Sequence, residues 1–188
     1  MKKRIFDIGF SSVALVVAAV PMAALYVVTR VKMGSPAIFE QQRLGKDKVP
    51  FTIYKFRSMR NEFDDRGAPL LYSKRATKFG KFMRSRGIDE LPQFWNILKG
   101  DMSVVGPRPK PETPINVVDF KVLGYPDIYS VKPGLVSSAK VEEVARGKKL
   151  PFDEYMALDV EDSKAPWSLG RDFNLIVRVL PAFNLFSG

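Results

Sequence analysis

The pattern of apolar and polar positions divides the chain into an apolar N-terminal segment and a longer mixed segment. Residues 8–29 carry no charge. At about 1.5 Å per residue, a helix of this length would just cross a bilayer core of about 30 Å. Pro21 lies near its middle, where it removes the hydrogen bond to the carbonyl of Val17 and favours a bend. The pattern therefore predicts a membrane helix over residues 1–33.

Basic residues flank this apolar segment on both sides and bear on its topology. Lys and Arg prefer the cytoplasmic side of a membrane, so a segment that is basic at both ends is best satisfied by entering and leaving through one face. The flanking bases are Lys2, Lys3, Arg4, Arg30 and Lys32. We therefore expect a re-entrant helix hairpin bent at Pro21, with a straight span as the alternative. Asp7 would lie at the membrane boundary, where we expect it to pair with Arg4 or Arg30.

Residues 34–188 alternate short apolar stretches with turns that contain Gly or Pro, and they fit one cytosolic domain at the membrane surface. The turn-like residues 45–48 separate two β-type runs, which predicts a hairpin. The predicted strands are 37–39 and 51–54, and the predicted helices are 76–86, a short one that ends at Gly100, 117–123, 151–159 and 169–180. The expected fold class is α+β: a re-entrant membrane helix followed by a small mixed α/β domain.

Two of the predicted helices carry apolar stripes at helical spacing. The stripe residues are Phe79, Phe82 and Met83 in 76–86, and Phe173, Ile176, Val177 and Leu180 in 169–180. Packing on the core is one explanation for such a stripe, and a position among lipid headgroups is the other. With a membrane segment in the same chain, we expect interfacial amphipathic helices.

Composition and charge limit the chemistry that this chain can perform. It has 30 Lys and Arg against 20 Asp and Glu, a formal net charge of +10, which suits an anionic partner such as phospholipid, nucleotide or nucleic acid. Cysteine and histidine are absent, which excludes disulfides, a Cys nucleophile, a His base and the usual zinc sites. Catalysis would rest on carboxylate, hydroxyl, Lys, Tyr or a hard cation, and phosphate-bound Mg²⁺ fits that inventory.

Two adjacent carboxylates, Asp89 and Glu90, precede a short helical pattern. Pro92 is tolerated only in a first turn, and Gly100 is a natural left-handed stop, so the carboxylates lie at or just before a helix N-terminus. Free N–H groups favour anions there. Basic residues surround the pair in sequence: Lys81, Arg84, Arg86, Lys99, Arg108 and Lys110. This arrangement suits a phosphate-handling site, while an Asp N-cap with a solvated neighbour is the alternative.

A series of motifs in fixed order resembles the bacterial sugar transferase family, the monotopic phosphoglycosyl transferases that start glycan assembly on a polyprenol phosphate. The matching pieces are Tyr54-Lys55-Phe56-Arg57-Ser58-Met59, Lys78-Phe79-Gly80-Lys81-Phe82-Met83-Arg84-Ser85, Asp89-Glu90-Leu91-Pro92-Gln93, Leu98-Lys99-Gly100-Asp101-Met102-Ser103 and Gly106-Pro107-Arg108-Pro109. With the membrane segment, the resemblance covers most of the first 140 residues.

The chain departs from the family pattern after its Lys-Pro-Gly turn at residues 132–134. Where many members have Thr-Gly and then Gln, this chain has Val136-Ser137 and then Lys140. An Asn-Gly-Arg element is replaced by residues 144–147. The departures concern recognition of the sugar and nucleotide and leave the carboxylate pair intact.

The resemblance implies a two-step transfer. Asp89 would attack the β-phosphate of a nucleoside diphosphate sugar, which we expect to be a UDP-sugar, and UMP would leave. Polyprenol phosphate would then take the phosphosugar from the enzyme. Glu90 would hold Mg²⁺ or manage the acceptor's proton, and both roles stay open. Arg84 and Arg108 are candidates for clamping phosphate, because a guanidinium binds two oxygens at once, and Lys55 and Arg57 rank below them.

The resemblance also implies the partners and the location. We expect a nucleoside diphosphate sugar, polyprenol phosphate and inner-membrane phospholipid as partners, with no nucleic acid, and a homodimer stays open. The expected location is the cytoplasmic face of the bacterial inner membrane. The alternative from another class is a membrane-anchored basic module that binds nucleic acid or anionic lipid without catalysis. That alternative gives no reason for adjacent carboxylates inside a basic cluster, because acids there weaken polyanion binding.

Overall fold

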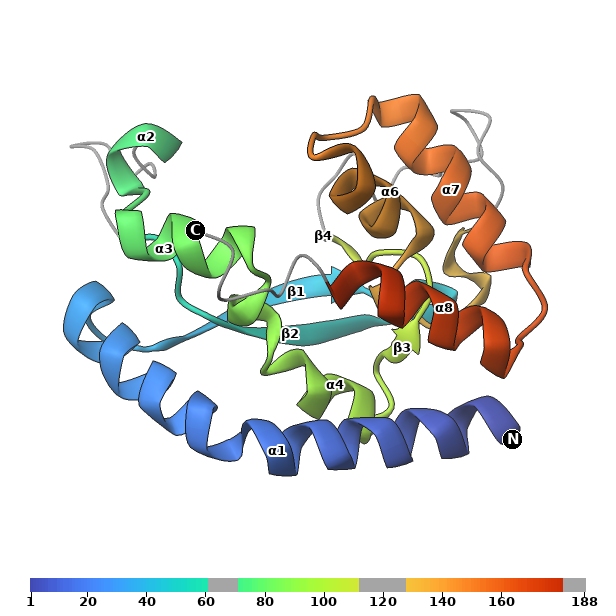
Figure 1. Ribbon diagram of the computed structural model, residues 1–188, viewed down its shortest axis with the longest axis horizontal. Helices are drawn as coiled ribbons and strands as arrows, with labels where there is room; N and C mark the ends of the chain where they lie inside the picture. Colours follow the sequence, from blue (N-terminus) through green and yellow to red (C-terminus); the bar gives the residue numbers. More distant parts are fainter. Residues whose placement is uncertain (61–70, 112–127, 181–188) are drawn as a thin grey trace.

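The computed structural model describes residues 1–60, 71–111 and 128–180, without the side chain of Tyr72. It is a mixed helix and sheet structure (Figure 1), as the expected α+β class requires. Its helices are α1 (Lys2–Met33), α2 (Tyr72–Arg75), α3 (Lys78–Ser85), α4 (Gln93–Lys99), α6 (Ser138–Arg146), α7 (Phe152–Lys164) and α8 (Leu169–Val179), with short 3₁₀ turns η1 (Lys46–Lys48), η2 (Ile88–Glu90) and η3 (Ile128–Ser130). Its strands are β1 (Ile38–Leu44), β2 (Pro50–Phe56), β3 (Ser103–Val105), β4 (Lys110–Pro111) and β5 (Gly134–Val136).

The N-terminal helix α1 contains Pro21 and is long and apolar enough to cross a membrane. It runs along one side of the molecule, and its second half turns away from the line of the first half (Figure 1). A proline in a helix interior removes a backbone hydrogen bond, which accounts for a bend near the middle. Most of the apolar side chains on α1 are exposed, including Val16, Val17 and Val20. An exposed apolar face of this length indicates association with a membrane.

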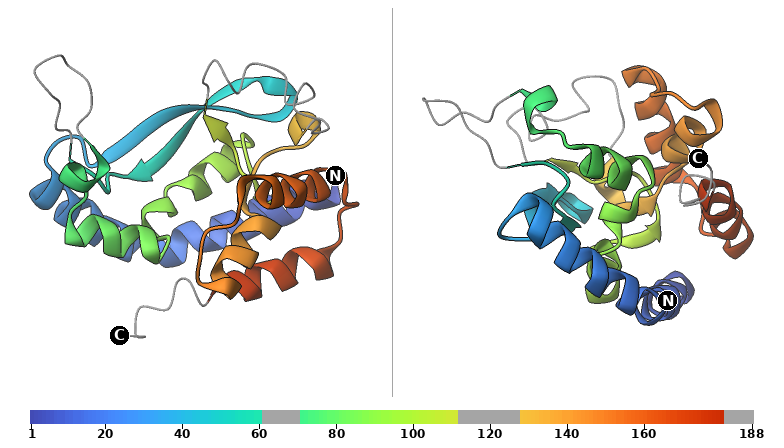
Figure 2. Two further views of the ribbon diagram at one scale, coloured as in Figure 1. Left: turned by 90° about the horizontal axis from the view of Figure 1, so that it is seen from above. Right: turned by 60° about the vertical axis from the view of Figure 1, so that its left-hand side comes forward.

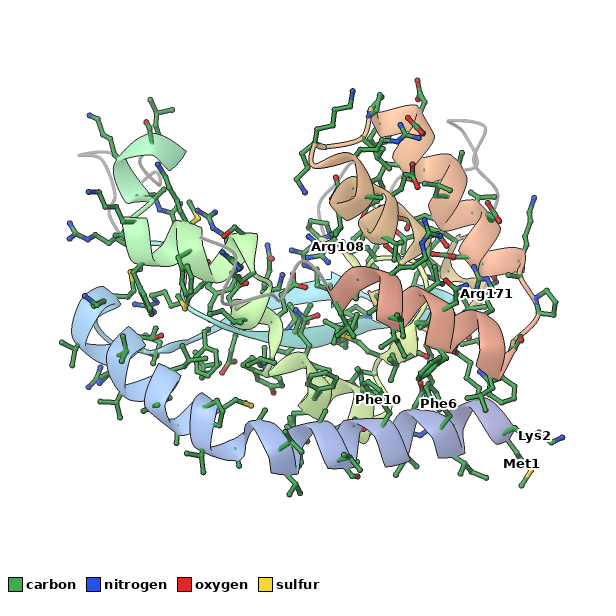
Figure 3. The ribbon with its side chains drawn as sticks, viewed as in Figure 1. Met1, Lys2, Phe6, Phe10, Arg108 and Arg171 are labelled. Carbon is green, nitrogen blue, oxygen red and sulfur yellow. The ribbon has the colours of Figure 1, made fainter. Side chains whose placement is uncertain are left out.

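The first turns of α1 pack against the rest of the protein. Phe6 and Phe10 project from α1 toward the interior (Figure 3) and contact the main hydrophobic core, where Phe10 lies 6.2 Å from Phe94 of α4 between ring centroids. Arg4 donates hydrogen bonds to two carbonyls at the C-terminal end of α4, those of Ile97 at 2.5 Å and Leu98 at 2.7 Å. A cation at this position complements the negative end of the helix dipole. The start of α1 is therefore anchored on α4.

The expected pairing of Asp7 with Arg4 or Arg30 is wrong. The Asp7 side chain is 3% exposed and accepts hydrogen bonds from the Ser103 hydroxyl at 2.9 Å and the Val104 N–H at 3.0 Å. A buried carboxylate needs donors, and β3 supplies them where the flanking arginines do not. Asp7 therefore links α1 to β3.

Two small sheets build the centre of the molecule. β1 and β2 form the predicted hairpin, with longer strands than the sequence indicated, and β4 extends it to a three-stranded antiparallel sheet in the order β2-β1-β4. β3 and β5 pair in parallel, with Val105 opposite Val136. The hairpin lies on one side of the molecule and α6, α7 and α8 lie on the other (Figure 2). The core between them comprises Ile53, Ile97, Met102, Val104, Val105, Leu135, Val136, Val141, Leu175, Ile176 and Val179.

The parallel pair depends on two glycines that touch. A Cβ on Gly134 would lie 2.1 Å from the backbone nitrogen of Gly106, so no side chain fits there. The Gly106 N–H donates to the carbonyl of Val136 at 2.9 Å, and the Gly134 N–H donates to the carbonyl of Pro107 at 2.8 Å. This contact holds the start of the Gly-Pro-Arg-Pro turn against β5. It thereby fixes the position of the Arg108 backbone.

The remaining helices differ in part from the expectations. α7 runs on to Lys164 where a helix over 151–159 was expected, because Asp162 is buried in it and accepts from the Ser138 N–H and hydroxyl at the start of α6. α8 divides its apolar residues between two faces: Leu175, Ile176 and Val179 are buried, whereas Leu169, Phe173 and Val177 are exposed, as is Leu180 directly after the helix. In α3, Met83 is buried and Phe82 is exposed. The helix expected over 117–123 lies outside the described residues.

Candidate active site

Asp89 and Glu90 lie in the 3₁₀ turn η2, directly before α4. Gly87 precedes the turn with a φ of 66°, which is left-handed backbone that glycine adopts readily, and it reverses the chain after α3. Pro92 occupies the N-cap position of α4, one residue before the expected first turn, and Gly100 ends the helix at a φ of 101°. The prediction that the carboxylates lie just before a helix N-terminus is therefore confirmed.

Glu90 is held by two cations from different parts of the chain. Its Oε1 accepts a hydrogen bond from Lys55 Nζ of β2 at 3.1 Å. Arg108 approaches the same carboxylate with both terminal nitrogens, Nη1 to Oε2 at 3.4 Å and Nη2 to Oε1. Burial opposes ionisation of Glu90, but the charges of Arg108 and Lys55 outweigh it and hold the pKa of Glu90 below its usual range. Glu90 is therefore ionised and fixed in place.

Asp89 has a different environment from its neighbour. It is 5% exposed, and the Ser58 hydroxyl donates a long hydrogen bond to its Oδ2 at 3.5 Å. Burial raises the pKa of Asp89, and the negative charge of Glu90 raises it further, to about 6. Ser58 is itself kept close by Gly80 of α3, because a Cβ there would lie 1.9 Å from the Ser58 carbonyl oxygen. Two adjacent carboxylates with pKa values pushed apart are the pattern of a site that assigns them different roles.

Arg108 is held from behind by α7, a contact that the sequence did not indicate. The Arg108 N–H donates to Asp159 Oδ1 at 3.3 Å, and Lys110 Nζ donates to Asp159 Oδ2 at 2.6 Å. Asp159 is fully buried, so this carboxylate fixes the turn on both sides of Pro109. From β1, Arg43 donates to the Pro109 carbonyl at 3.0 Å. These contacts leave the guanidinium of Arg108 free to aim at Glu90.

A cavity of about 430 Å³ opens over the two carboxylates. Its charged lining comprises six cations and two acids: Lys55, Lys81, Arg84, Arg108, Lys140 and Lys149 against Asp89 and Glu90. Of the candidate substrate-binding residues, the structure therefore brings Lys55, Arg84 and Arg108 to the carboxylates. The excess of positive charge suits an anion that carries several phosphate oxygens.

Arg57 lies apart from this cavity. Its guanidinium donates to the carbonyl of Ser35 at 2.8 Å, its backbone N–H donates to the carbonyl of Ala37 at 2.8 Å, and the residue is 5% exposed. Burial lowers the pKa of Arg57. It shares a small separate cavity of about 90 Å³ with Lys55. Arg57 thus ties the end of β2 to the segment that follows α1, where Ser35 and Ala37 lie.

Sequence reasoning missed Asp159 and Lys140 as members of the site. Asp159 was assigned to an ordinary helix, and only its spacing three residues after the buried Met156 marks it as inward-facing. Lys140 was noted as a departure from the family pattern, without a role. Both residues reach the site through tertiary contacts of α6 and α7, which no local pattern reveals.

The carboxylate pair also suits a magnesium ion that arrives with a diphosphate. Mg²⁺ is usually bound by one or two carboxylates together with substrate phosphates and waters. Asp89 and Glu90 offer such oxygens side by side, and no cluster of three or more acids that could hold a metal is present among the described residues. These two carboxylates therefore fit a magnesium site that the substrate phosphates complete better than a site built by protein ligands alone.

Fold and site together define a membrane-associated protein with a carboxylate pair in a strongly basic cavity. The family model described as "Bacterial sugar transferase" matches residues 1–184, and the chain belongs to this family. It is 41% identical over 143 residues to an uncharacterised sugar transferase of Bacillus subtilis, covering 74% of this chain and 67% of that protein. It is 33% identical over 188 residues to a UDP-glucose:undecaprenyl-phosphate glucose-1-phosphate transferase of Caulobacter vibrioides, covering 97% of this chain and 69% of that protein.

A third relative is longer than this chain. The UDP-N-acetylgalactosamine-undecaprenyl-phosphate N-acetylgalactosaminephosphotransferase of Aeromonas hydrophila is 39% identical over 141 residues, which cover 74% of this chain and 33% of that protein. The matched region therefore spans about two thirds of the first two relatives and one third of this one.

Proposed function

We propose that this protein is a phosphoglycosyl transferase that moves a phosphosugar from a UDP-sugar to polyprenol phosphate. Membership of the bacterial sugar transferase family supports this proposal, as do relatives whose names specify a UDP-sugar and undecaprenyl phosphate. The observation that carries it is Asp89, a buried carboxylate beside an ionised Glu90 in a cavity rich in cations. In a chain without Cys or His, Asp89 is the best-placed nucleophile.

In the first step, a carboxylate oxygen of Asp89 attacks the β-phosphorus of the UDP-sugar. The bond from that phosphorus to the bridging oxygen breaks, and UMP leaves with the bridging oxygen and its electron pair. The product on the enzyme is an aspartyl phosphosugar. Burial makes the Asp89 carboxylate poorly solvated, which strengthens it as a nucleophile once it is ionised. Arg84 and Arg108 would hold phosphate oxygens, since phosphoryl transfer depends mainly on positioning and charge neutralisation.

In the second step, an oxygen of polyprenol phosphate attacks the same phosphorus, and the Asp89 carboxylate leaves. The products are polyprenol diphosphate sugar and the original enzyme. Glu90 acts chiefly by fixing Lys55 and Arg108, because its low pKa makes it a weak acceptor for a proton. Mg²⁺ on Asp89, Glu90 and the diphosphate would neutralise part of the phosphate charge when it is bound.

The proposal includes a position at the membrane. α1 would enter and leave the bilayer through the cytoplasmic face of the inner membrane, bent at Pro21, because both of its ends are basic. The exposed residues Leu169, Phe173 and Val177 of α8 would contact phospholipid as an interfacial helix. Polyprenol phosphate, itself a membrane lipid, would then reach the cavity along the protein surface. A homodimer remains a prediction from the sequence alone.

The test is a covalent trapping experiment. Wild-type enzyme with Mg²⁺ and a panel of UDP-sugars, without acceptor, should release UMP up to one equivalent per enzyme. Intact-mass analysis should show a phosphosugar adduct, and peptide mapping should place it on Asp89. Asp89→Asn should release no UMP and form no adduct. Release of UMP only after polyprenol phosphate is added would refute the two-step mechanism.

The second class considered, a basic membrane module without catalysis, has no support from the names of the relatives. Such a module would bind duplex DNA or anionic vesicles tightly. Asp89→Asn and Glu90→Gln would both strengthen that binding, because each substitution removes a negative charge from the cavity. Turnover of any UDP-sugar in the trapping experiment excludes it.

A further inference from the structure

The cavity over the carboxylates continues into a second cavity of about 500 Å³. The two share the lining residues Arg84, Ser85, Lys140 and Lys149. We name the second cavity the outer arm; its remaining lining is Glu143, Val144, Gly147 and Lys148. A volume of this size is in the usual range for a small-molecule site. The outer arm therefore offers room for a part of the substrate that does not react.

Lys140 lies at the junction of the two cavities, and its ammonium group has no carboxylate partner among the described residues. Three of the other cations nearby are compensated: Lys55 and Arg108 pair with Glu90, and Lys149 pairs with Glu143 at 2.9 Å. Lys140 is half-buried, so water compensates it only in part. Burial lowers the pKa of Lys140, and the charge of Arg108 lowers it further. Within the part of the chain that the structure describes, the charge of Lys140 is thus left unbalanced.

The position of Lys140 in its helix adds to this cost. α6 begins after Ser137, whose hydroxyl accepts from the Lys140 N–H at 3.2 Å, so Lys140 lies in the first turn. A cation there opposes the positive end of the helix dipole. A half-buried lysine in a first turn, with no ion pair among the described residues, does not stabilise the fold, and an anionic ligand would satisfy its ammonium group.

The direction of the outer arm indicates which part of the substrate it receives. The connection between α6 and α7, which includes Gly147 and Lys148, lies at the end of the molecule opposite α1 (Figure 1 and Figure 2). A lipid acceptor is confined to the membrane side, where α1 lies. The water-soluble part of the donor is the nucleotide, and it departs during the first step. The end remote from α1 therefore suits the nucleotide.

We infer that Lys140 binds the phosphate of the departing nucleotide and that the outer arm holds its nucleoside. This inference rests on the proposed function, because it assigns a part of the same substrate. When the bond between the β-phosphorus and the bridging oxygen breaks, negative charge grows on the nucleotide phosphate. Lys140 donates hydrogen bonds to that phosphate, and no proton is transferred. Lys140 is thus a third phosphate-binding residue beside Arg84 and Arg108, and it is directed at the leaving group.

The test compares Lys140→Gln with wild type in the complete membrane enzyme. Gln keeps most of the side-chain length and removes the charge. It should not lower the melting temperature, because Lys140 makes no ion pair within the described ranges. We expect the inhibition constant of UMP to rise by about tenfold to a hundredfold, the range for loss of a hydrogen bond to a charged group. Weak inhibition by uridine, which has no phosphate, should stay within about twofold.

Two further variants and the rate of transfer to the acceptor complete the test. Lys140→Arg keeps the charge and should retain the UMP inhibition constant within a few-fold. Lys164→Gln, which removes an exposed lysine at the end of α7, is the matched control and should change nothing. Transfer from a preformed phosphosugar enzyme, freed of UMP, to polyprenol phosphate should proceed at the wild-type rate in Lys140→Gln.

Each contrary result has a distinct meaning. An unchanged inhibition constant for UMP in Lys140→Gln, with active wild type, overturns this inference and leaves the proposed function standing. Equal weakening of UMP and uridine, or slower transfer to the acceptor, also overturns it, because Lys140 would then serve the nucleoside, the sugar or the acceptor. Wild type that neither turns over a UDP-sugar nor binds UMP in a direct binding titration overturns both.

Discussion

Removing the charge of Asp89 should stabilise the protein, although we propose that the same change abolishes activity. The rise of the Asp89 pKa from 3.8 to about 6 means that ionisation is less favourable in the folded protein than in the unfolded chain. At about 1.36 kcal/mol per pKa unit, the cost is roughly 3 kcal/mol at pH 8. Asp89→Asn lacks this cost. For a chain of this size, about 2–4 °C per kcal/mol gives a melting temperature higher by about 5–10 °C, after an allowance for the buried amide.

The effect has a defined dependence on pH. Below about pH 4, the Asp89 carboxyl is protonated in both the folded and the unfolded states, so it costs nothing and the variant gains little. As pH rises toward the folded pKa of about 6, the unfolded chain ionises first and wild type loses stability. The gain of Asp89→Asn over wild type should therefore grow between about pH 4 and pH 6 and then level off.

Removing the charge of the neighbouring Glu90 should lower the stability of the protein. Glu90→Gln leaves Lys55 and Arg108 without their shared carboxylate, and breaking one partner of a buried ion pair is destabilising. We expect a lower melting temperature for this variant at pH 8. Glu161→Gln, which removes an exposed carboxylate on α7, is the matched control and should change stability by no more than about 0.5 kcal/mol.

The assay is differential scanning fluorimetry of detergent-solubilised protein in EDTA, at intervals from pH 4 to pH 8. EDTA keeps divalent cations from the carboxylates, so that only the protein's own charges act. An Asp89→Asn variant that is no more stable than wild type at pH 8, or whose gain is independent of pH, would show that burial and Glu90 do not raise this pKa. A stabilising Glu90→Gln would show that the ion pairs with Lys55 and Arg108 are not net favourable.

Three other variants test the remaining parts of the site and fold. Arg108→Lys keeps the charge but loses the two-nitrogen contact with Glu90, so UMP release should slow by about tenfold or more, and an equal rate would make Arg108 a source of general charge only. Gly134→Ala should give little folded protein on size-exclusion chromatography, because the new Cβ would lie 2.1 Å from the Gly106 nitrogen. A normal yield of folded protein would mean that β3 and β5 separate easily. Pro21→Leu should move one end of α1 across the membrane. Labelling of single cysteines introduced at positions 2 and 32 in intact cells measures this. Labelling of the two positions from opposite faces in the protein with Pro21 would contradict the re-entrant helix.

The sequence by itself determined the elements whose signals are local. The uncharged run of residues 8–29 marks the membrane helix, and the turn residues at 45–48 mark the hairpin between β1 and β2. Pro92 and Gly100 bound α4 because one lacks a backbone N–H and the other accepts left-handed backbone. The adjacent Asp89 and Glu90 were placed before that helix by the same reasoning. Each of these features depends on neighbours within a few residues.

Only the tertiary structure decided which charges meet. Asp7 pairs with β3, nearly 100 residues away in the chain, where the sequence suggested a neighbouring arginine. Asp159 fixes the Arg108 turn from α7, and Lys140 enters the cavity from α6 without an ion-pair partner among the described residues. Arg57, a candidate for substrate binding, instead donates to the Ser35 carbonyl. A buried charge takes the nearest donor or acceptor that the packed chain supplies, and hydrophobic periodicity and caps do not encode that choice.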